Sequence, residues 1–145
     1  MKKIHVFCFA NYCRSPVVEK VLQNLLGEKY QVTSSGLKPI TRGGMDLRSQ
    51  KYLKSIGIQN LNHFPSKIQP HHLKNNDLIL AMDSSLLASL VEKKFKISNK
   101  LKIFHFLDKE NEVHDPYSFS DEDYKDSMSK IHHHCEKWAK FILEN

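Results

Sequence analysis

The sequence predicts an α/β fold: a single domain over residues 1–145, with a four-stranded parallel sheet and helices on both of its faces. Two observations lead to this prediction. Four short apolar segments alternate along the chain with stretches whose apolar residues recur at helical spacing. The chain has 145 residues, which is enough for one domain with its own hydrophobic core. Strands that are separated by helices are joined by right-handed crossovers, and this connection makes the sheet parallel.

The first half of the chain contains two predicted strands and two predicted helices. Residues 3–9 are apolar and form the first buried strand, and residues 16–26 form a helix. Residues 30–33 form a second short strand, which ends in a turn at the Ser-Ser-Gly of 34–36. Residues 46–56 form the next helix. A glycine follows each of the two helices and is a common stop signal.

The second half repeats this alternation. Residues 77–82 are a continuous apolar run and form the third buried strand, followed by a helix over residues 84–95. Residues 101–106 form the fourth strand, and residues 120–143 form a long final helix. The apolar stripe of that helix consists of Tyr124, Met128, Ile131, Cys135, Trp138, Phe141 and Ile142.

The composition limits the class of protein. Apolar residues make up 40% and charged residues 26%, which is typical of a soluble globular domain. The sequence has no signal-peptide pattern and no apolar run of about 20 residues, so we expect no membrane insertion. Three cysteines do not form a disulfide framework, and we expect a cytoplasmic protein with reduced thiols.

The net charge of +6 favours anionic partners in general. All but three of the 22 basic residues are lysines, and they are spread through the chain, so a solvated lysine surface is the favoured interpretation. No nucleic-acid recognition motif and no interleaving of aromatic and basic residues accompanies them. We therefore expect no nucleic-acid partner.

The segment after the first predicted strand, residues 8–16, carries the strongest functional signal. It reads Cys-Phe-Ala-Asn-Tyr-Cys-Arg-Ser-Pro, so Cys8 ends the strand and Pro16 begins the helix. The backbone N–H groups of the segment and the positive end of the helix then converge on one point, which suits a phosphate-sized anion. The sequence thus predicts a Cys-x5-Arg phosphate loop, in which the Arg14 guanidinium holds two phosphate oxygens.

Other side chains of this loop suit nucleophilic chemistry. Cys8 lies in the positive field, which favours the thiolate and makes it a nucleophile at neutral pH. Ser15 can donate a hydrogen bond to that thiolate, and Asn11 suits a left-handed turn position. Cys13 has two interpretations: it lines the loop, or it captures oxidised Cys8 as a reversible disulfide.

The pattern Cys-x5-Arg-Ser-Pro after a first strand resembles that of the low-molecular-weight protein tyrosine phosphatases, Cys-x-Gly-Asn-x-Cys-Arg-Ser-Pro. The chain departs from it at Ala10, where the family has glycine. The resemblance continues in the Ser-Ser-Gly of 34–36 and in a Gly-x-x-Asp-x-Arg stretch at 43–48. It also includes the Asp-Pro-Tyr of 115–117, which in the family holds the general acid.

The resemblance implies a protein tyrosine phosphatase that works through a phosphocysteine intermediate on Cys8, without cofactor or metal. Arg14 would hold the phosphate, and Asp115 would act as general acid and base. The implied substrate-binding residues are Phe9, Ala10, Asn11, Tyr12, Cys13, Ser15 and Tyr117. The stretch 108–117 and the helix with Trp138 most resemble the bacterial branch, which implies a phosphotyrosine protein and a bacterial tyrosine kinase as partners.

Alternative functions remain open from the residues alone. An arsenate reductase on the same scaffold would need two further cysteines, and the chain offers only Cys135, on the last helix. A zinc site could use Cys8 and Cys13, but the adjacent histidines at 132–134 point in different directions around a helix. A non-catalytic module that binds a phosphoanion is supported by Ala10 alone.

Overall fold

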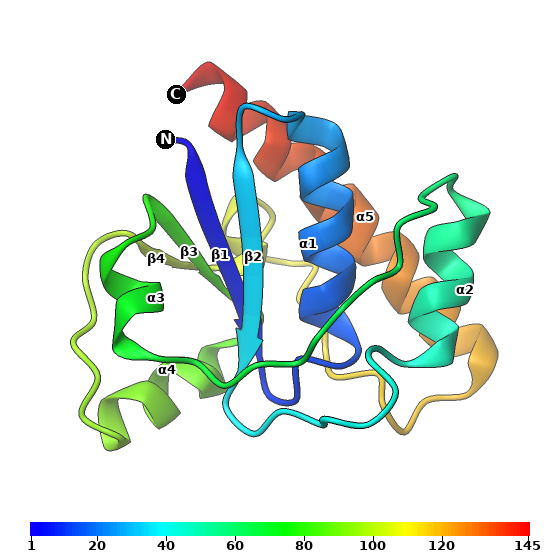
Figure 1. The fold of residues 1–145 in the computed structure, drawn as a ribbon, viewed down its shortest axis with the longest axis horizontal. Coiled ribbons are helices and arrows are strands. Elements are labelled where there is room, and N and C mark those ends of the chain that lie inside the picture. Colours follow the sequence, from blue (N-terminus) through cyan, green and yellow to red (C-terminus); the bar gives the residue numbers. More distant parts are fainter.

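A computed structural model describes residues 1–145 and contains a parallel sheet of four strands in the order β2-β1-β3-β4 (Figure 1). In chain order the elements are β1 (Lys3–Cys8), α1 (Arg14–Leu26), β2 (Gln31–Gly36), α2 (Leu47–Ser55), α3 (Pro70–Lys74), β3 (Leu78–Ala81), α4 (Ser84–Glu92), β4 (Leu101–Ile103), the 3₁₀ turn η1 (Phe104–Leu107) and α5 (Asp121–Glu144). The predicted α/β class and parallel sheet are confirmed.

The central strand β1 determines where a ligand can bind. It pairs in parallel with β2 on one side and with β3 on the other, and its residues from Ile4 to Cys8 are all buried. The chain leaves β1 towards β2 and leaves β3 towards β4, so the two connections diverge at the carboxyl edge of the sheet. A crevice at such a point is where open parallel sheets bind ligands. Cys8, the last residue of β1, lies at this edge.

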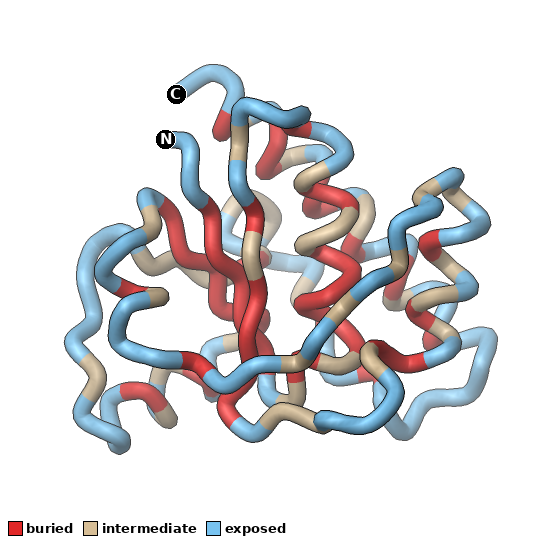
Figure 2. Tube along the Cα trace, in the orientation of Figure 1, coloured by how far each residue is buried: buried red, intermediate tan, exposed pale blue.

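Helices cover both faces of the sheet. α1 and α5, with α2 beside them, lie on one face, and α3 and α4 lie on the other (Figure 1). Buried residues concentrate on the strands and on the inner sides of α1 and α5 (Figure 2). Trp138 of α5 is 1% exposed and closes the core beneath η1 by donating from its indole nitrogen to the Phe104 carbonyl. None of the helices combines the length and the apolar composition that a membrane crossing requires.

Residues 34–36 were predicted to form a turn, and this prediction is wrong because they complete β2. Their composition favours a turn, but the side chains of the two serines are buried and form hydrogen bonds with neighbouring residues. The Ser35 hydroxyl lies 2.7 Å from Nε2 of His5, and the Ser34 hydroxyl donates to Glu19 at 2.7 Å. Tertiary contacts therefore override the local preference.

The second half differs from the prediction at its element ends. α4 ends at Glu92 rather than at Phe95, because Lys94 adopts a left-handed conformation with φ of 64°. The amides of Lys94 and Phe95 then bond back to the Val91 and Leu90 carbonyls at 2.9 and 3.0 Å, which is the Schellman arrangement that closes a helix. The last strand is shorter than predicted and continues as η1. The five-residue helix α3 was not predicted.

Candidate active site

The 8–16 segment wraps around the side chain of Cys8, a residue that is 3% exposed. The backbone N–H of Asn11 donates to this sulfur at 3.2 Å, and the Ser15 hydroxyl lies 2.9 Å from it. Asn11 has the predicted left-handed conformation, with φ of 51°. The chain reverses direction between β1 and α1, and this left-handed turn directs the backbone N–H of Asn11 towards the sulfur.

A buried hydrogen-bond network holds the turn in place. The side-chain amide of Asn11 donates to the hydroxyls of Ser15 at 2.9 Å and Ser34 at 3.0 Å, and its Oδ1 accepts from the Ser66 amide at 3.0 Å. The Asn11 carbonyl lies 2.7 Å from Nε2 of His63, which must therefore carry a proton. Burial lowers the pKa of His63, so the ring is held neutral. Because Ser15 accepts from Asn11, its own proton is free to point at the sulfur.

Gly36 allows the loop to lie against the end of β2. A Cβ atom at this position would lie 2.7 Å from the Asn11 nitrogen and 2.8 Å from the Phe9 carbonyl oxygen, so backbone would have to move. Ala10 occupies the position where the resembling pattern has glycine, and it does not have positive φ. Its Cβ is therefore accommodated without backbone strain.

Arg14, the first residue of α1, is 2% exposed. Its Nη1 donates to Oδ2 of Asp83 at 2.9 Å and to the Val113 carbonyl at 3.0 Å. Burial alone would raise the pKa of Asp83, but the hydrogen bond from Ser85 and the Arg14 charge outweigh it and hold the pKa below its usual range. The anionic Asp83 thus fixes the guanidinium, whose Nε and Nη2 form no hydrogen bonds within the protein.

These groups converge on a pocket of about 310 Å³ at the carboxyl edge of the sheet. Its lining residues are Cys8, Phe9, Ala10, Cys13, Arg14, Lys38, Ile40, Asp115 and Tyr117. Asp115 comes from the loop before α5, 107 residues after Cys8 in the chain, and its Oδ1 accepts the Tyr117 amide at 3.1 Å. The pocket therefore contains a thiol, a guanidinium and a carboxyl group together.

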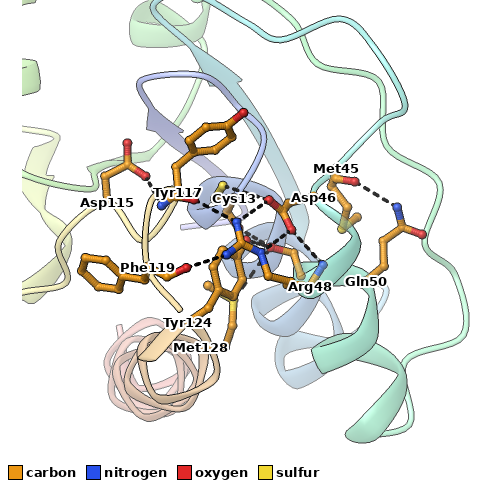
Figure 3. Close-up of polar contacts among 11 residues, drawn as sticks. Cys13, Met45, Asp46, Arg48, Gln50, Asp115, Tyr117, Phe119, Tyr124 and Met128 are labelled. Carbon is orange, nitrogen blue, oxygen red and sulfur yellow. Dashed lines mark hydrogen bonds and ion pairs between the residues drawn. The ribbon is translucent and has the colours of Figure 1, made fainter. Parts of the chain in front are cut away.

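Arg48 of α2 fastens the loop that carries Asp115 and Tyr117 (Figure 3). It donates to the carbonyls of Tyr117 and Phe119, at 2.9 Å each. It also holds Asp46 through two side-chain bonds of 3.1 and 3.0 Å, and its guanidinium carbon lies 4.0 Å from the centre of the Tyr124 ring. One side chain thereby joins α2, α5 and this loop.

Cys13 lies beside this network. Its sulfur is 3.9 Å from Oδ2 of Asp46, and burial raises its pKa to about 12. Cys13 is therefore a thiol at neutral pH, although it lines the same pocket as Cys8. All three cysteines are free, and Cys135 is fully buried in α5 among the core residues.

A family model for low molecular weight phosphotyrosine protein phosphatases matches residues 3–145. The chain belongs to this family. It is 28% identical over 140 residues to the low molecular weight protein-tyrosine-phosphatase Wzb of Salmonella typhi, which covers 97% of this chain and 93% of that protein. It is 27% identical to the Etp protein of Escherichia coli K12, over 94% of this chain and 92% of that protein.

Solved structures of this phosphatase family share the fold. The tyrosine phosphatase AmsI of Erwinia amylovora superposes with a TM-score of 0.88, at 24% identity, over 96% of this chain and 91% of that one. Wzb of Escherichia coli K30, crystallised with sulphate, gives a TM-score of 0.86 at 25% identity, over 97% of this chain and 98% of that one. The family that the sequence resembles is thus confirmed.

The residues expected to form the phosphatase site fall into three groups by their location: in the pocket wall, buried within the loop, and at the rim of the pocket. Most line the pocket, whereas Asn11 and Ser15 are fully buried members of the loop whose side chains bond to each other and brace it. Tyr12 does not line the pocket, and its ring packs at the rim, 6.3 Å from the Tyr117 ring. Sequence reasoning gave no role in the site to the supporting residues Lys38, Ile40, His63, Ser66 and Asp83. They lie in irregular segments or at a helix end, where no periodic signal identifies them.

Proposed function

We propose that this chain is a protein tyrosine phosphatase that hydrolyses phosphotyrosine through a phosphocysteine intermediate on Cys8. The observation that carries the proposal is the meeting of Cys8, Arg14 and Asp115 in one pocket. A thiol, a guanidinium and a carboxyl group are the nucleophile, phosphate ligand and proton donor that this hydrolysis needs. The relatives named as protein-tyrosine-phosphatases in Salmonella typhi and Escherichia coli support the same substrate class.

In the first step, the Cys8 thiolate attacks phosphorus in line with the ester oxygen. The S–P bond forms while the P–O bond to the tyrosine ring breaks, and protonated Asp115 gives its proton to the leaving oxygen. The equatorial oxygens bind to Nε and Nη2 of Arg14 and to the backbone N–H groups of residues 9–15. Because Asp83 already holds Nη1, the guanidinium is oriented before the substrate arrives.

In the second step, the Asp115 carboxylate takes a proton from a water molecule, whose oxygen attacks phosphorus. The S–P bond breaks, and inorganic phosphate and the Cys8 thiolate are released. The Ser15 hydroxyl, 2.9 Å from the sulfur, and the Asn11 amide, at 3.2 Å, both stabilise the leaving thiolate by donating hydrogen bonds. No step requires a metal ion.

The shape of the pocket favours an aryl phosphate. The phosphate must reach the sulfur of Cys8, a residue that is only 3% exposed, so the ester has to be long and flat. Phe9, Ile40 and Tyr117 supply apolar surface along the wall for the ring of such an ester. The proposed substrate is phosphotyrosine in a protein, and the proposed partner is a bacterial tyrosine kinase. The reduced thiol suits a cytoplasmic location.

We also propose that Cys13 captures oxidised Cys8 as a reversible disulfide and so protects it from irreversible over-oxidation, because both line the pocket. Hydrogen peroxide converts the Cys8 thiolate to sulfenic acid and releases hydroxide. The Cys13 sulfur then attacks the sulfenic sulfur, an S–S bond forms, and water leaves. The Asp46 carboxylate, 3.9 Å from the Cys13 sulfur, is in place to accept the thiol proton and to pass it to the leaving hydroxide, which departs as that water. A thiol reductant would reverse the disulfide.

Turnover of a phosphotyrosine peptide tests the proposed activity. The parent protein should release phosphate from it and should not act on a phosphoserine peptide of the same sequence. Cys8→Ser should abolish turnover while inorganic phosphate still binds, because the loop amides and Arg14 remain. Turnover by Cys8→Ser within about tenfold of the parent would show that Cys8 is not the nucleophile.

A further inference from the structure

On the other face of the sheet from α1, the 93–100 segment passes α3 on its way to β4 (Figure 1). Residues of this segment and of α3 line a second hollow. Its volume is about 740 Å³. Five of its nine lining residues are lysines: Lys74, Lys93, Lys94, Lys96 and Lys100. The floor is less polar, because Leu73 is buried, Phe95 is half-buried and Pro70 lies beside them. We call this hollow the lysine groove.

The lysines of the groove have no carboxylate partner. The four ion pairs of the molecule involve other cations, and the sequence has no Asp or Glu between residues 93 and 107. Asp77, which lies near Lys100, already accepts the backbone amides of Lys2 and Lys3 at 2.9 Å each. Clustered like charges repel one another, so a negatively charged ligand would be attracted to this groove.

The chemistry of the groove favours an acidic peptide over a nucleic acid. Lysine offers a point charge and lacks the planar fork with which arginine reads phosphates and bases. Phe95 is the one aromatic lining residue, and it is half-buried rather than presented for base stacking. A concave groove with apolar residues in its floor fits an extended chain better than the flat surface of a membrane.

α4 connects this groove to the candidate active site. Asp83, at its N-terminal end, holds Arg14, and Lys93, at its C-terminal end, lines the groove. The nine residues of α4 span about 14 Å at 1.5 Å per residue. An extended peptide covers this distance in roughly four to five residues, at about 3.3 Å each. One extended substrate chain is therefore long enough to reach from one place to the other.

We propose that the lysine groove binds an acidic, extended segment of the protein substrate and so holds the substrate while its phosphotyrosine enters the pocket. The assignment of this segment to a substrate rests on the proposed phosphatase function, whereas the binding itself does not. Asp and Glu side chains would pair with the lysines of the rim, and an apolar side chain between them would rest against Leu73 and Phe95.

Two phosphotyrosine peptides test the proposal. One carries about six Asp or Glu residues beginning some five residues from the phosphotyrosine, and the other carries Asn and Gln instead. At low salt, the parent should prefer the acidic peptide about tenfold in kcat/KM, through KM rather than kcat. Removing three charges with Lys93→Gln, Lys96→Gln and Lys100→Gln should abolish that preference. The matched control, Lys29→Gln, Lys54→Gln and Lys140→Gln, removes three exposed charges elsewhere and should retain it.

Binding of the unphosphorylated acidic peptide separates this proposal from the proposed activity. NMR shift changes confined to residues 70–74 and 93–100 would support the groove even if no phosphotyrosine were hydrolysed. Equal preference in the groove variant and the control would overturn the proposal, as would acidic-peptide shifts that avoid these residues. Binding of anionic vesicles or an oligonucleotide through the groove, with none of the acidic peptide, would also overturn it.

Discussion

Replacing Arg48 by alanine should detach the loop that carries Asp115 from the body of the protein. The substitution removes four side-chain hydrogen bonds: two to Asp46 and one each to the carbonyls of Tyr117 and Phe119. It also removes the contact between the guanidinium and the Tyr124 ring. Asp115 itself makes no bond to Arg48, so an effect on its chemistry has to pass through the position of the loop.

The expected loss of stability follows from these contacts. Buried hydrogen bonds to a charged group contribute about 1.5–3 kcal/mol each, but the Arg48 side chain is 28% exposed and its bonds are not independent. We therefore expect the free energy of unfolding to fall by about 2–3 kcal/mol. Arg48→Lys keeps one charge and lacks the fork, so its loss should be smaller.

The expected kinetic effect depends on the leaving group. A positioned general acid contributes about 10²- to 10⁴-fold, and a loosened loop should forfeit part of this, about 10- to 100-fold in kcat/KM for phenyl phosphate, because kcat/KM reports on the first step alone. An activated ester such as p-nitrophenyl phosphate needs little protonation, so its kcat/KM should change by less than about threefold. Measuring kcat/KM across a series of aryl phosphates, beside urea unfolding, gives both quantities. A stability loss with an unchanged ratio between poor and good leaving groups would refute the role of Arg48 in positioning Asp115.

Four further predictions concern other parts of the molecule. Asp115→Asn should lower kcat/KM for phenyl phosphate far more than for p-nitrophenyl phosphate in steady-state assays, and equal losses in kcat/KM would exclude Asp115 as the acid. After a peroxide dose, thiol reductant should restore the parent but not Cys13→Ser, and peptide mapping should find a Cys8–Cys13 linkage; a linkage to another cysteine would contradict this. Gly36→Ala should cost about 1–3 kcal/mol in urea unfolding and lower kcat, because the new Cβ meets loop backbone at 2.7 Å; parent-like values would contradict the contact. Burial, aided by two neighbouring histidines, lowers the pKa of His5 to about 3, so between pH 6.5 and 3 the unfolded chain binds a proton that the folded chain excludes. Stability should fall with acidification in that window by up to about 1.4 kcal/mol per pH unit, and His5→Gln should flatten the slope.

The central part of the site could be predicted because its residues lie close together in the sequence. Cys8 and Arg14 lie in one loop. The apolar strand before this loop and the proline after it indicate that the loop connects a buried strand to the start of a helix. Asp115 is distant, and no local pattern gives it a role. It was predicted from the family resemblance alone.

The supporting residues could not be predicted for a physical reason. His63 and Ser66 bond to Asn11 from a segment without regular structure, more than 50 residues away along the chain. The serines at the end of β2 were assigned to a turn because local composition does not reveal that their hydroxyls are buried. Arg48 matches a family motif, but its hold on the loop before α5 depends on contacts that span about 70 residues.

The bond between Arg14 and the Val113 carbonyl has a consequence for the newly made protein. It joins residues 99 positions apart, so the arginine emerges from the ribosome long before its partner. At about 5–20 residues per second, translation takes on the order of 5–20 s to cover this distance. Throughout that time the chain has Cys8 and Arg14 but no completed pocket. The pocket therefore stays incomplete until the segment with Val113 and Asp115 has been synthesised and has folded against the loop of Arg14.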